Sequence, residues 1–520
     1  MTSTFHSIET AKRSLFTQTA ALSTTGHNIA NVNTPGYSRQ VVKMTESIPM
    51  APFAFLRSTA PGQLGTGSEF VSIERIRESF LDDQFRKESS SQGAWDVRLS
   101  TLGKLEATLN EPSDSGLAKV INNFWDAWSD FSKDPQDITN RKIVKETTLA
   151  LTDSINQMSR QMNDLSSDLT NSVDLQASSM NSLLSQVASL NSNINKIESL
   201  GDNANDLRDQ RDYAMDQLSK LANVQVAPLE TGYQVTLAGQ IVVSGDTVTT
   251  PVTAAMLQAG YEGGTLTGGE TFGTLYSKDV YVADYKNQLN QLVNTLANGQ
   301  VEITLPAGSV LPEGTMLNNV LYSNANNNRT LGSDLKVTVN GINGLHKLGY
   351  TLAGNSPAAG GDFFVSKDGS PLSADNVTLS QLIKDDPNYI ASSIRTAGTG
   401  ADEKVVSGNN SLALLMSGLK ISKFDFGAAF SKTATIDDFF TSIVGQIGVE
   451  SKEAERQVQN AVLLTDQVNG SRQSISGVSL DEEMSNLIKY QHAYGAASRF
   501  MTTTDELLNK LINSTGIVGR

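Results

Sequence analysis

The sequence predicts an α+β multidomain protein in which N- and C-terminal helices pair as a coiled-coil rod, continue into a helical bundle, and carry inserted β-rich outer domains. Each end of the chain has a narrow apolar stripe at three- and four-residue spacing, which is typical of a coiled-coil seam. The middle changes to β-branched runs separated by glycine and asparagine, which is typical of hairpins. Because a narrow stripe buries little by itself and neither end has a partner nearby in the sequence, we expect the two ends to pair.

The stripes predict helices over residues 5–30 and 480–513. The first of these has no Lys, Arg, Asp or Glu between Arg13 and Arg39, so we expect it to pack against several neighbours. The two helices form the candidate assembly interface, where each stripe contacts its partner and other copies of the chain. The interface residues are Phe5, Ile8, Leu15, Leu22 and Ile29 at one end, and Leu480, Met484, Leu487, Tyr494, Met501, Leu508 and Ile512 at the other.

A turn ends the first helix. Pro35 cannot continue a helix, and Pro35-Gly36 favours a type II turn because Gly36 tolerates a positive φ. Alternating side chains over residues 37–44 then predict a strand, and residues 50–70 have the proline and glycine content of a loop.

The remaining elements follow from periodicity and turn residues. Helices are predicted over residues 72–110, 115–132, 137–200, 205–222, 278–298 and 437–470, and strands within residues 224–277 and at 301–305, 335–339, 362–366 and 376–379. The helix over residues 137–200 has two apolar heptad blocks. The alternating charges of residues 206–212 are interpreted as a solvated helix face with neighbouring ion pairs.

These elements predict four domains. Residues 1–57 plus 472–520 form a terminal helical core domain, and residues 58–223 plus 278–299 plus 405–471 form a helical rod domain. Residues 224–277 plus 340–404 form a β-rich outer domain, and residues 300–339 form a further β insertion.

Composition excludes several classes of function. With 40 basic and 55 acidic residues the net charge is −15, which disfavours nucleic acid or an anionic membrane as the main partner. The chain has no cysteine, so it has no disulfide and no thiolate site, as suits a protein exported unfolded. We expect no membrane span and no cleaved signal peptide, because no run of eighteen apolar residues and no signal-peptide core occur.

A search for catalytic patterns finds none. The four histidines, His6, His27, His346 and His492, lack metal-ligand spacing and are interpreted as surface or packed residues. Nucleophile elbows, phosphate loops and dinucleotide fingerprints are absent. We therefore expect no catalytic residue, no metal and no cofactor, and no enzyme.

Five segments, in order along the chain, carry a family resemblance. They are residues 28–40, which include Asn-Thr-Pro-Gly-Tyr-Ser-Arg-Gln; the aromatic segment 124–130 with Asp134, Pro135 and Arg141; residues 204–212; residues 346–350 with 361–364; and residues 476–483 with Tyr490, Gln491, Ala493 and Tyr494. Together they resemble the bacterial flagellar hook-associated protein 1 family, whose members form the hook–filament junction. The family signature turn is Asn31, Asn33, Thr34, Pro35, Gly36, Tyr37, Ser38 and Arg39.

The resemblance implies a structural subunit of the extracellular flagellum. It implies export through the flagellar type III channel as an unfolded chain, followed by assembly into a helical tube through terminal helices that line its channel. The implied partners are further copies of the chain, the hook protein, the third hook-associated protein on the filament side, and an export chaperone at the C-terminal helix. The chain departs from the family pattern at the insertion over residues 300–339, whose role the resemblance does not supply.

Three alternatives stay open at this point. The Asn-Thr-Pro-Gly-Tyr signature also fits a hook or distal rod axial protein. An extracellular adhesin or enzyme carried by residues 224–405 on a flagellar stem is a second alternative. A coiled-coil signalling protein is the third, although the β-rich middle counts against it.

Overall fold

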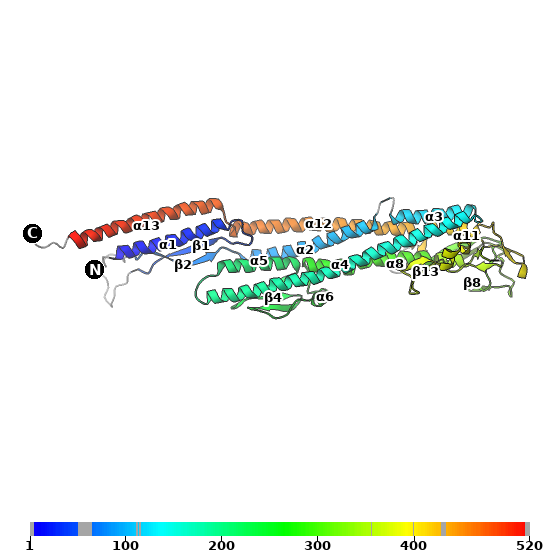
Figure 1. Cartoon of the computed structure of the whole chain (residues 1–520), viewed down its shortest axis with the longest axis horizontal. Coiled ribbons are helices and arrows are strands. Elements are labelled where there is room, and N and C mark those ends of the chain that lie inside the picture. Colours follow the sequence, from blue (N-terminus) through cyan, green and yellow to red (C-terminus); the bar gives the residue numbers. More distant parts are fainter. Residues whose placement is uncertain are drawn as a thin grey trace, which may run out of the picture. The chain divides into compact units, whose positions relative to one another are not determined.

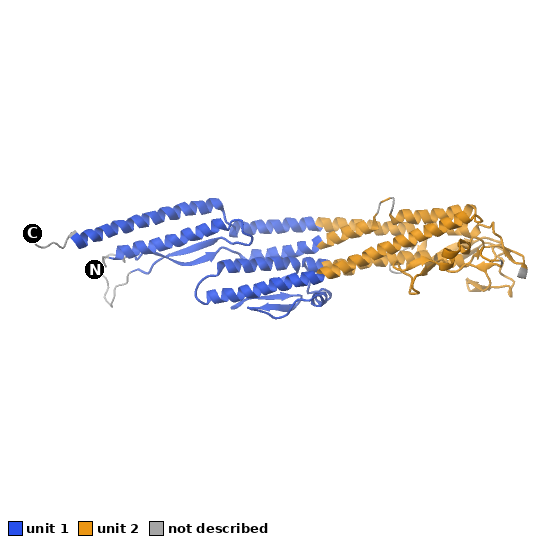
Figure 2. Ribbon diagram, viewed as in Figure 1, with its two compact units in different colours: residues 1–96, 173–273, 457–520 blue, residues 97–172, 274–456 orange. Residues whose placement is uncertain are grey.

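The computed structural model describes residues 5–49, 65–110, 113, 116–354, 356–398, 400–427 and 433–514. Contacts divide the chain into two compact units, which Figure 2 colours separately. Unit 1 comprises residues 1–96, 173–273 and 457–520, and unit 2 comprises residues 97–172 and 274–456. The four-domain division stays a prediction, and its boundary at 57/58 lies outside the described residues.

In unit 1 the two ends of the chain pair, as predicted. Helix α1 (His6–Ala30) lies between α13 (Leu480–Ser514) and a two-stranded ribbon of β1 (Gln40–Glu46) and β2 (Ser68–Arg75) (Figure 1). The two strands are antiparallel, with Val42 opposite Ile73. The prediction of loop and helix over residues 68–75 is wrong. That segment forms a strand because β1 offers it a complete hydrogen-bonding edge, which a local pattern does not reveal.

The rest of unit 1 combines α5 (Asn205–Leu221) with a four-stranded antiparallel sheet. The sheet has the order β3 (Val224–Leu229), β4 (Gly232–Leu237), β5 (Gln240–Ser244), β6 (Thr247–Val248). Two helices, α6 (Ala254–Glu262) and α7 (Gly269–Tyr276), lie within the range predicted as strands. The missed signal for α6 is Thr253, whose side chain accepts a hydrogen bond from the Met256 amide and caps the helix.

Three long helices contribute residues to both units: α2 (Ser79–Leu109), α4 (Ile138–Glu198) and α12 (Ile436–Ser476). In α4, all six residues of the first predicted heptad block are buried: Leu151, Ile155, Met158, Met162, Leu165 and Leu169. The apolar face of this part of α4 is therefore covered by other segments of the same chain.

Unit 2 is built on helices around an aromatic core. Its helices are α3 (Leu117–Lys133), a π-helical turn η1 (Ser277–Val282) that continues into α8 (Ala283–Asn298), α9 (Gly341–Lys347), α10 (Gln381–Asp385) and α11 (Ser411–Gly418), with 3₁₀ turns at Pro387–Tyr389, Gly400–Asp402 and Leu419–Ile421. Trp125 and Trp128 of α3 are buried, as predicted; the Trp128 ring lies beside Phe363, and the Trp125 ring lies beside Phe124.

The strands of unit 2 are short. The largest sheet has the order β10 (Leu335–Asn340), β7 (Gln300–Leu305), β17 (Phe424–Asp425), β18 (Thr433–Ala434). The other pairs are antiparallel: β8 (Thr315–Leu317) with β9 (Val320–Tyr322), β11 (Tyr350–Thr351) with β12 (Ala358–Ala359), β13 (Phe364–Ser366) with β14 (Val377–Leu379), and β15 (Thr396–Ala397) with β16 (Lys404–Val405). The segment over residues 300–339 thus contains strands, as predicted.

Candidate assembly site

Helices α1 and α13, here called the terminal helix pair, bury mainly small side chains, against each other and against the β1–β2 ribbon. The buried residues of α1 are Ala11, Thr17, Ala21, Thr24, Thr25 and Asn28, and those of α13 are Glu483, Ala497 and Thr504. Positions 483, 497 and 504 are separated by whole heptads, so they follow one line along α13. No large apolar side chain is fully buried among the described residues of either helix.

The predicted interface residues lie beside this seam instead of at its centre. Ile8, Leu15, Leu22, Ile29, Leu487, Met501 and Leu508 are half-buried, and Phe5, Leu480, Met484, Tyr494 and Ile512 are exposed. Leu480, Leu487, Tyr494, Met501 and Leu508 lie three or four residues from the buried positions of α13 and so flank the seam on the same side of the helix, whereas Met484 and Ile512 follow a line one residue further on. The pairing of the two ends is therefore as predicted, and the assembly role of the apolar stripe stays a prediction.

The signature turn has the predicted geometry. Gly36 has a φ of 80°, and the Tyr37 amide donates to the Thr34 carbonyl at 3.2 Å, as in a type II turn. Any side chain at position 36 would also collide with Tyr213 of α5, because a Cβ there would lie 2.8 Å from the Tyr213 Cβ. Glycine is thus required twice, for conformation and for close approach.

The other signature residues divide between the end of α1 and the surface. The Asn31 amide group donates to the His27 carbonyl at 3.0 Å, and the Thr34 hydroxyl donates to Asn31 Oδ1 at 3.1 Å. Asn33 and Pro35 are exposed. The turn therefore closes the C-terminal end of α1 with its own side chains.

Asn28 links the end of α1 to β1 and α13. Its amide donates to the Gln40 carbonyl at 2.8 Å and to Glu483 Oε2 at 3.0 Å. Its carbonyl oxygen accepts from the Gln40 amide at 3.0 Å and from the Tyr37 hydroxyl at 2.8 Å. Asn28 thereby uses all four of its hydrogen-bonding positions. Burial and the nearby Asp206, Asp209 and Glu483 carboxylates raise the pKa of Tyr37, so its hydroxyl stays protonated and able to donate.

Arg39 continues this connection. Its Nε donates to Glu483 Oε1 at 2.8 Å, its Nη1 donates to Glu482 Oε2 at 2.7 Å, and its backbone amide donates to the Ser476 carbonyl at 2.8 Å. The last landmark named in the resemblance is therefore in contact with the first: residues 28–40 bind residues 476–483.

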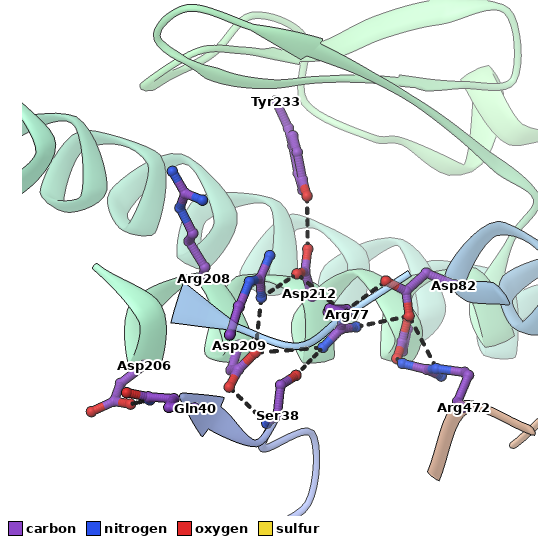
Figure 3. Close-up of polar contacts among 12 residues, drawn as sticks. Ser38, Gln40, Arg77, Asp82, Asp206, Arg208, Asp209, Asp212, Tyr233 and Arg472 are labelled. Atoms are coloured by element: carbon purple, nitrogen blue, oxygen red, sulfur yellow. Dashed lines mark hydrogen bonds and ion pairs between the residues drawn. The ribbon is translucent and has the colours of Figure 1, made fainter. Parts of the chain in front are cut away.

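Four arginines and four aspartates form a buried group next to the signature turn, here called the ion-pair cluster (Figure 3). Its members are Arg75, Arg77, Asp82, Arg86, Asp209, Asp212, Asp216 and Arg472. They come from the end of β2, the segment after it, α2, α5 and the last turns of α12, all in unit 1. The eight charges balance, so the cluster joins five segments of unit 1 through paired charges.

Several guanidinium–carboxylate pairs in the ion-pair cluster lie within hydrogen-bonding distance. Arg77 forms a two-bond fork with Asp82, at 2.7 and 3.0 Å. Arg472 reaches Asp82 at 3.0 Å and Asp216 at 2.7 Å, and Arg75 reaches Asp212 at 2.7 Å. Forked guanidinium–carboxylate bonds of this kind are strong and directional.

The cluster is tied to the signature turn and to the β3–β6 sheet. The Ser38 amide donates to Asp209 Oδ2 at 2.8 Å, and the Tyr233 hydroxyl of β4 donates to Asp212 Oδ1 at 2.9 Å. Burial alone would raise the pKa of Asp212, but the guanidiniums of Arg77, Arg75, Arg86 and Arg211 hold it below its ordinary value. Asp212 is therefore an ionised carboxylate at neutral pH.

The interpretation of residues 206–212 as a solvated helix face is wrong. Asp209, Asp212 and Asp216 are buried at three- and four-residue spacing, the positions where a helix usually places apolar residues. Sequence reasoning missed them because the balancing arginines lie far away in the sequence, on β2, α2 and α12. Asn28, Gln40 and Glu483 were missed as single residues, although the landmark segments contain all three.

Unit 2 holds two further buried polar residues from the landmarks. His346 is buried between the Gly361 carbonyl, which accepts from Nδ1 at 2.7 Å, and the Ala391 amide, which donates to Nε2 at 2.9 Å. Burial lowers the pKa of His346 to about 4, so the ring is neutral. Arg141 donates to the Ser392 hydroxyl at 2.8 Å and lies over the Phe131 ring. Both are packed structural residues, as the sequence indicated for the histidine.

Over the described residues, no group of three or more His, Asp or Glu side chains is arranged to hold a metal ion. None of the helices in the described ranges combines the length and hydropathy that crossing a membrane requires.

Comparison with known proteins identifies the family. A model of the helical domain of flagellar hook-associated protein FlgK matches residues 102–304, and models of flagellar rod proteins match residues 8–37 and 471–514. Flagellar hook-associated protein 1 of Bacillus subtilis is 32% identical over 537 residues, covering 100% of both chains. The chain belongs to the flagellar hook-associated protein 1 family. Its counterpart in Escherichia coli is 24% identical, covering 97% of this chain and 99% of that protein.

A solved structure has a similar fold. The flagellar hook junction protein FlgK of Burkholderia pseudomallei superimposes with a TM-score of 0.52 at 13% identity, over 76% of this chain and 100% of that one. As a hook-associated protein 1, the chain is a structural protein of the extracellular flagellum, at the hook–filament junction, and not an enzyme. The matches at the two ends alone would also fit a rod or hook protein; the match over residues 102–304 and the full-length relatives decide between them.

Proposed function

We propose that copies of this chain join through the terminal helix pair into a helical tube at the hook–filament junction. The supporting observation is the apolar surface that the pair leaves uncovered. On α13, eight large apolar side chains are 42–66% exposed: Leu480, Met484, Ile488, Tyr494, Phe500, Leu507, Leu511 and Ile512. On α1, Phe5 and Phe16 are similarly exposed. Exposed apolar side chains gathered in this way are characteristic of interaction surfaces.

The tube geometry follows from how identical copies repeat. A rotation and rise that do not close on themselves produce heterologous contacts, in which each copy uses two different surfaces. The line of Glu483, Ala497 and Thr504 is used inside the chain, and most of the exposed apolar side chains of α13, such as Met484, Ile488 and Leu507, lie off that line. One surface of α13 thus binds α1 and the others are available to neighbouring copies.

We further propose the hook protein and the third hook-associated protein as neighbours at the two ends of the junction. An export chaperone binds α13 before assembly, since the exposed apolar residues of α13 need cover during transit. Export takes place through the flagellar type III channel as an unfolded chain; a chain without cysteine forms no disulfide that would oppose unfolding.

The test places two charges on the exposed surface of α13. Met484→Asp combined with Ile488→Asp should leave export and the hook intact and abolish the filament in a strain that lacks the wild-type chain. Leu175→Asp, at an exposed apolar residue of α4, is the matched control and should leave filaments normal. Helicity of the purified variant should equal that of wild type, which separates loss of assembly from loss of folding. Normal filaments with the double variant would contradict the proposal.

A further inference from the structure

We propose that Glu483 and Arg39 set the register in which α13 pairs with α1. Glu483 is 2% exposed, and it is the one charged residue among the described buried residues of α13. Its two carboxylate oxygens are both occupied, Oε1 by Arg39 Nε and Oε2 by the Asn28 amide. A buried, fully bonded charge at one end of a helix seam acts on alignment more than on gross stability.

The seam otherwise offers little to fix an alignment. Its other buried residues are Ala, Thr and Asn, and those of α13 are an alanine and a threonine a heptad apart. If α13 slides along α1 by one heptad, small side chains of α13 again face small side chains of α1, and the heptad spacing of the two helices still matches. Apolar packing therefore leaves neighbouring registers close in free energy.

The carboxylate distinguishes between those registers. A slide of one heptad in one direction places Glu483 beside Ala21, which offers no donor, and in the other direction carries it past the end of α1 at Ala30. In either case a charge loses both of its partners and part of its solvation. Only the observed register satisfies Glu483.

Arg39 is held in place by contacts that do not depend on α13. Its backbone amide binds the Ser476 carbonyl at the end of α12, and the next residue, Gln40, is bonded through both backbone groups to Asn28. The guanidinium is thus presented from a fixed backbone. It is a positioning residue: α13 must align to it. The consequence for the flagellum rests on the function proposed above, because exposed residues of many copies meet only when every copy has the same register.

Cross-linking measures the register directly, because the chain has no cysteine of its own. The helices run in opposite directions from the Asn28–Glu483 contact, so equal steps along each bring Ser14 opposite Ala497 (Figure 1). Ser14→Cys with Ala497→Cys reports the observed register. Ser7→Cys or Ala21→Cys, each with Ala497→Cys, reports a slide of one heptad in one direction or the other. A short bismaleimide serves as the probe on the purified full-length chain.

The decisive variant is Arg39→Met combined with Glu483→Leu, which replaces the ion pair with apolar side chains. The first reporter should fall and the slid reporters should rise above background, because the ion pair no longer favours the observed register. Arg39→Lys, which keeps the charge, should retain the first reporter. Glu482→Leu is the matched control: it removes an exposed carboxylate that also binds Arg39, and it should change no reporter.

Two results would overturn the proposal. One is a double variant in which the first reporter still dominates and the slid reporters stay at background. The other is loss of all three reporters together with helicity, since residues that only set register are not required for pairing. A variant that slides but still supports filaments would leave the register role standing and contradict only its link to assembly.

Discussion

Helices α4 and α13 have the same apolar periodicity in the sequence but different surroundings in the structure. In α4 the heptad residues from Leu151 to Leu169 are all buried within the chain. In α13 the corresponding apolar residues are exposed or half-buried, and the seam is made by Glu483, Ala497 and Thr504. The period alone thus says that a helix has an apolar face, and not which molecule covers that face.

The difference also separates two ways of holding helices together. Helix α4 gains its stability from apolar area removed from water, which is strong and not directional. The terminal helix pair is held by directional contacts: Asn28 of α1 bonds to Gln40 of β1 and to Glu483 of α13, and Arg39 bonds to Glu483. Under the proposed assembly, in which the apolar surface binds neighbouring copies, the subunit needs such contacts, because that surface is not used internally.

The largest effect is expected in the ion-pair cluster. Asp212→Ala should cost about 3–5 kcal/mol of the free energy of unfolding of unit 1, because Arg75 and its neighbours lose a buried counter-charge. Asp202→Ala, at an exposed aspartate, is the control and should stay within about 0.5 kcal/mol of wild type in urea titrations. Since the pKa of Asp212 is lowered in the folded chain, its contribution is present at neutral pH and is lost as the pH falls through that lowered value. A cost near zero would mean that apolar contacts alone hold this region.

The second effect tests how much the buried apolar residues of α4 contribute to the free energy of unfolding. Leu151→Ala should cost about 2–5 kcal/mol, because it removes a fully buried side chain and leaves a cavity. Leu175→Ala, on the same helix but 70% exposed, should cost less than about 0.5 kcal/mol. Urea titrations followed by circular dichroism provide the measurement. Equal costs at the two positions would show that burial does not distinguish them.

The third effect is a pH dependence of stability that comes from His346 in unit 2. The pKa of His346 is lowered from 6.5 to about 4 in the folded chain. Between these two pH values His346 is protonated in the unfolded chain but stays neutral in the folded chain. The contribution of His346 to the free energy of unfolding is fully present above pH 6.5 and decreases as the pH approaches 4. The decrease between pH 7 and pH 5 is about 2 kcal/mol.

Tryptophan fluorescence reports this region, because the Trp128 ring contacts Phe363, which contacts His346. His346→Asn should lower stability at pH 7 and remove most of the dependence between pH 7 and pH 5. His492→Asn, at an exposed histidine of α13, should keep the wild-type dependence. An unchanged slope in the His346 variant would assign the acid sensitivity to other groups.

The smallest effect is expected at the apolar surface of α13. Met484→Ala should change the free energy of unfolding of the free chain by less than about 0.5 kcal/mol, because the side chain is half exposed. Compared with Leu151→Ala in the same titration, this variant shows whether the surface is reserved for other molecules. A cost of several kcal/mol would mean that Met484 is part of the internal core.

Much of the fold was predictable because its signals are local. Periodicity located α1, α3, α4, α5, α12 and α13, and Pro35-Gly36 predicted a type II turn that the structure contains. Strand β2 was missed because it forms by pairing with β1, whereas α6 was missed although its signal, the cap at Thr253, is local. The candidate site was predicted only in outline, since Glu483, Ala497 and Thr504, the buried residues of α13, were not among the predicted interface residues.

The sequence by itself determined that the two ends are helical, that they need partners, and that residues 28–40 and 476–483 carry family landmarks. Only the tertiary structure decided that these landmarks bind each other through Asn28, Arg39 and Glu483, and that the aspartates of α5 are buried. The physical reason is that a charged residue looks alike in sequence whether solvent or a distant arginine surrounds it. Its environment is set by chain segments far away, which meet only when the chain folds.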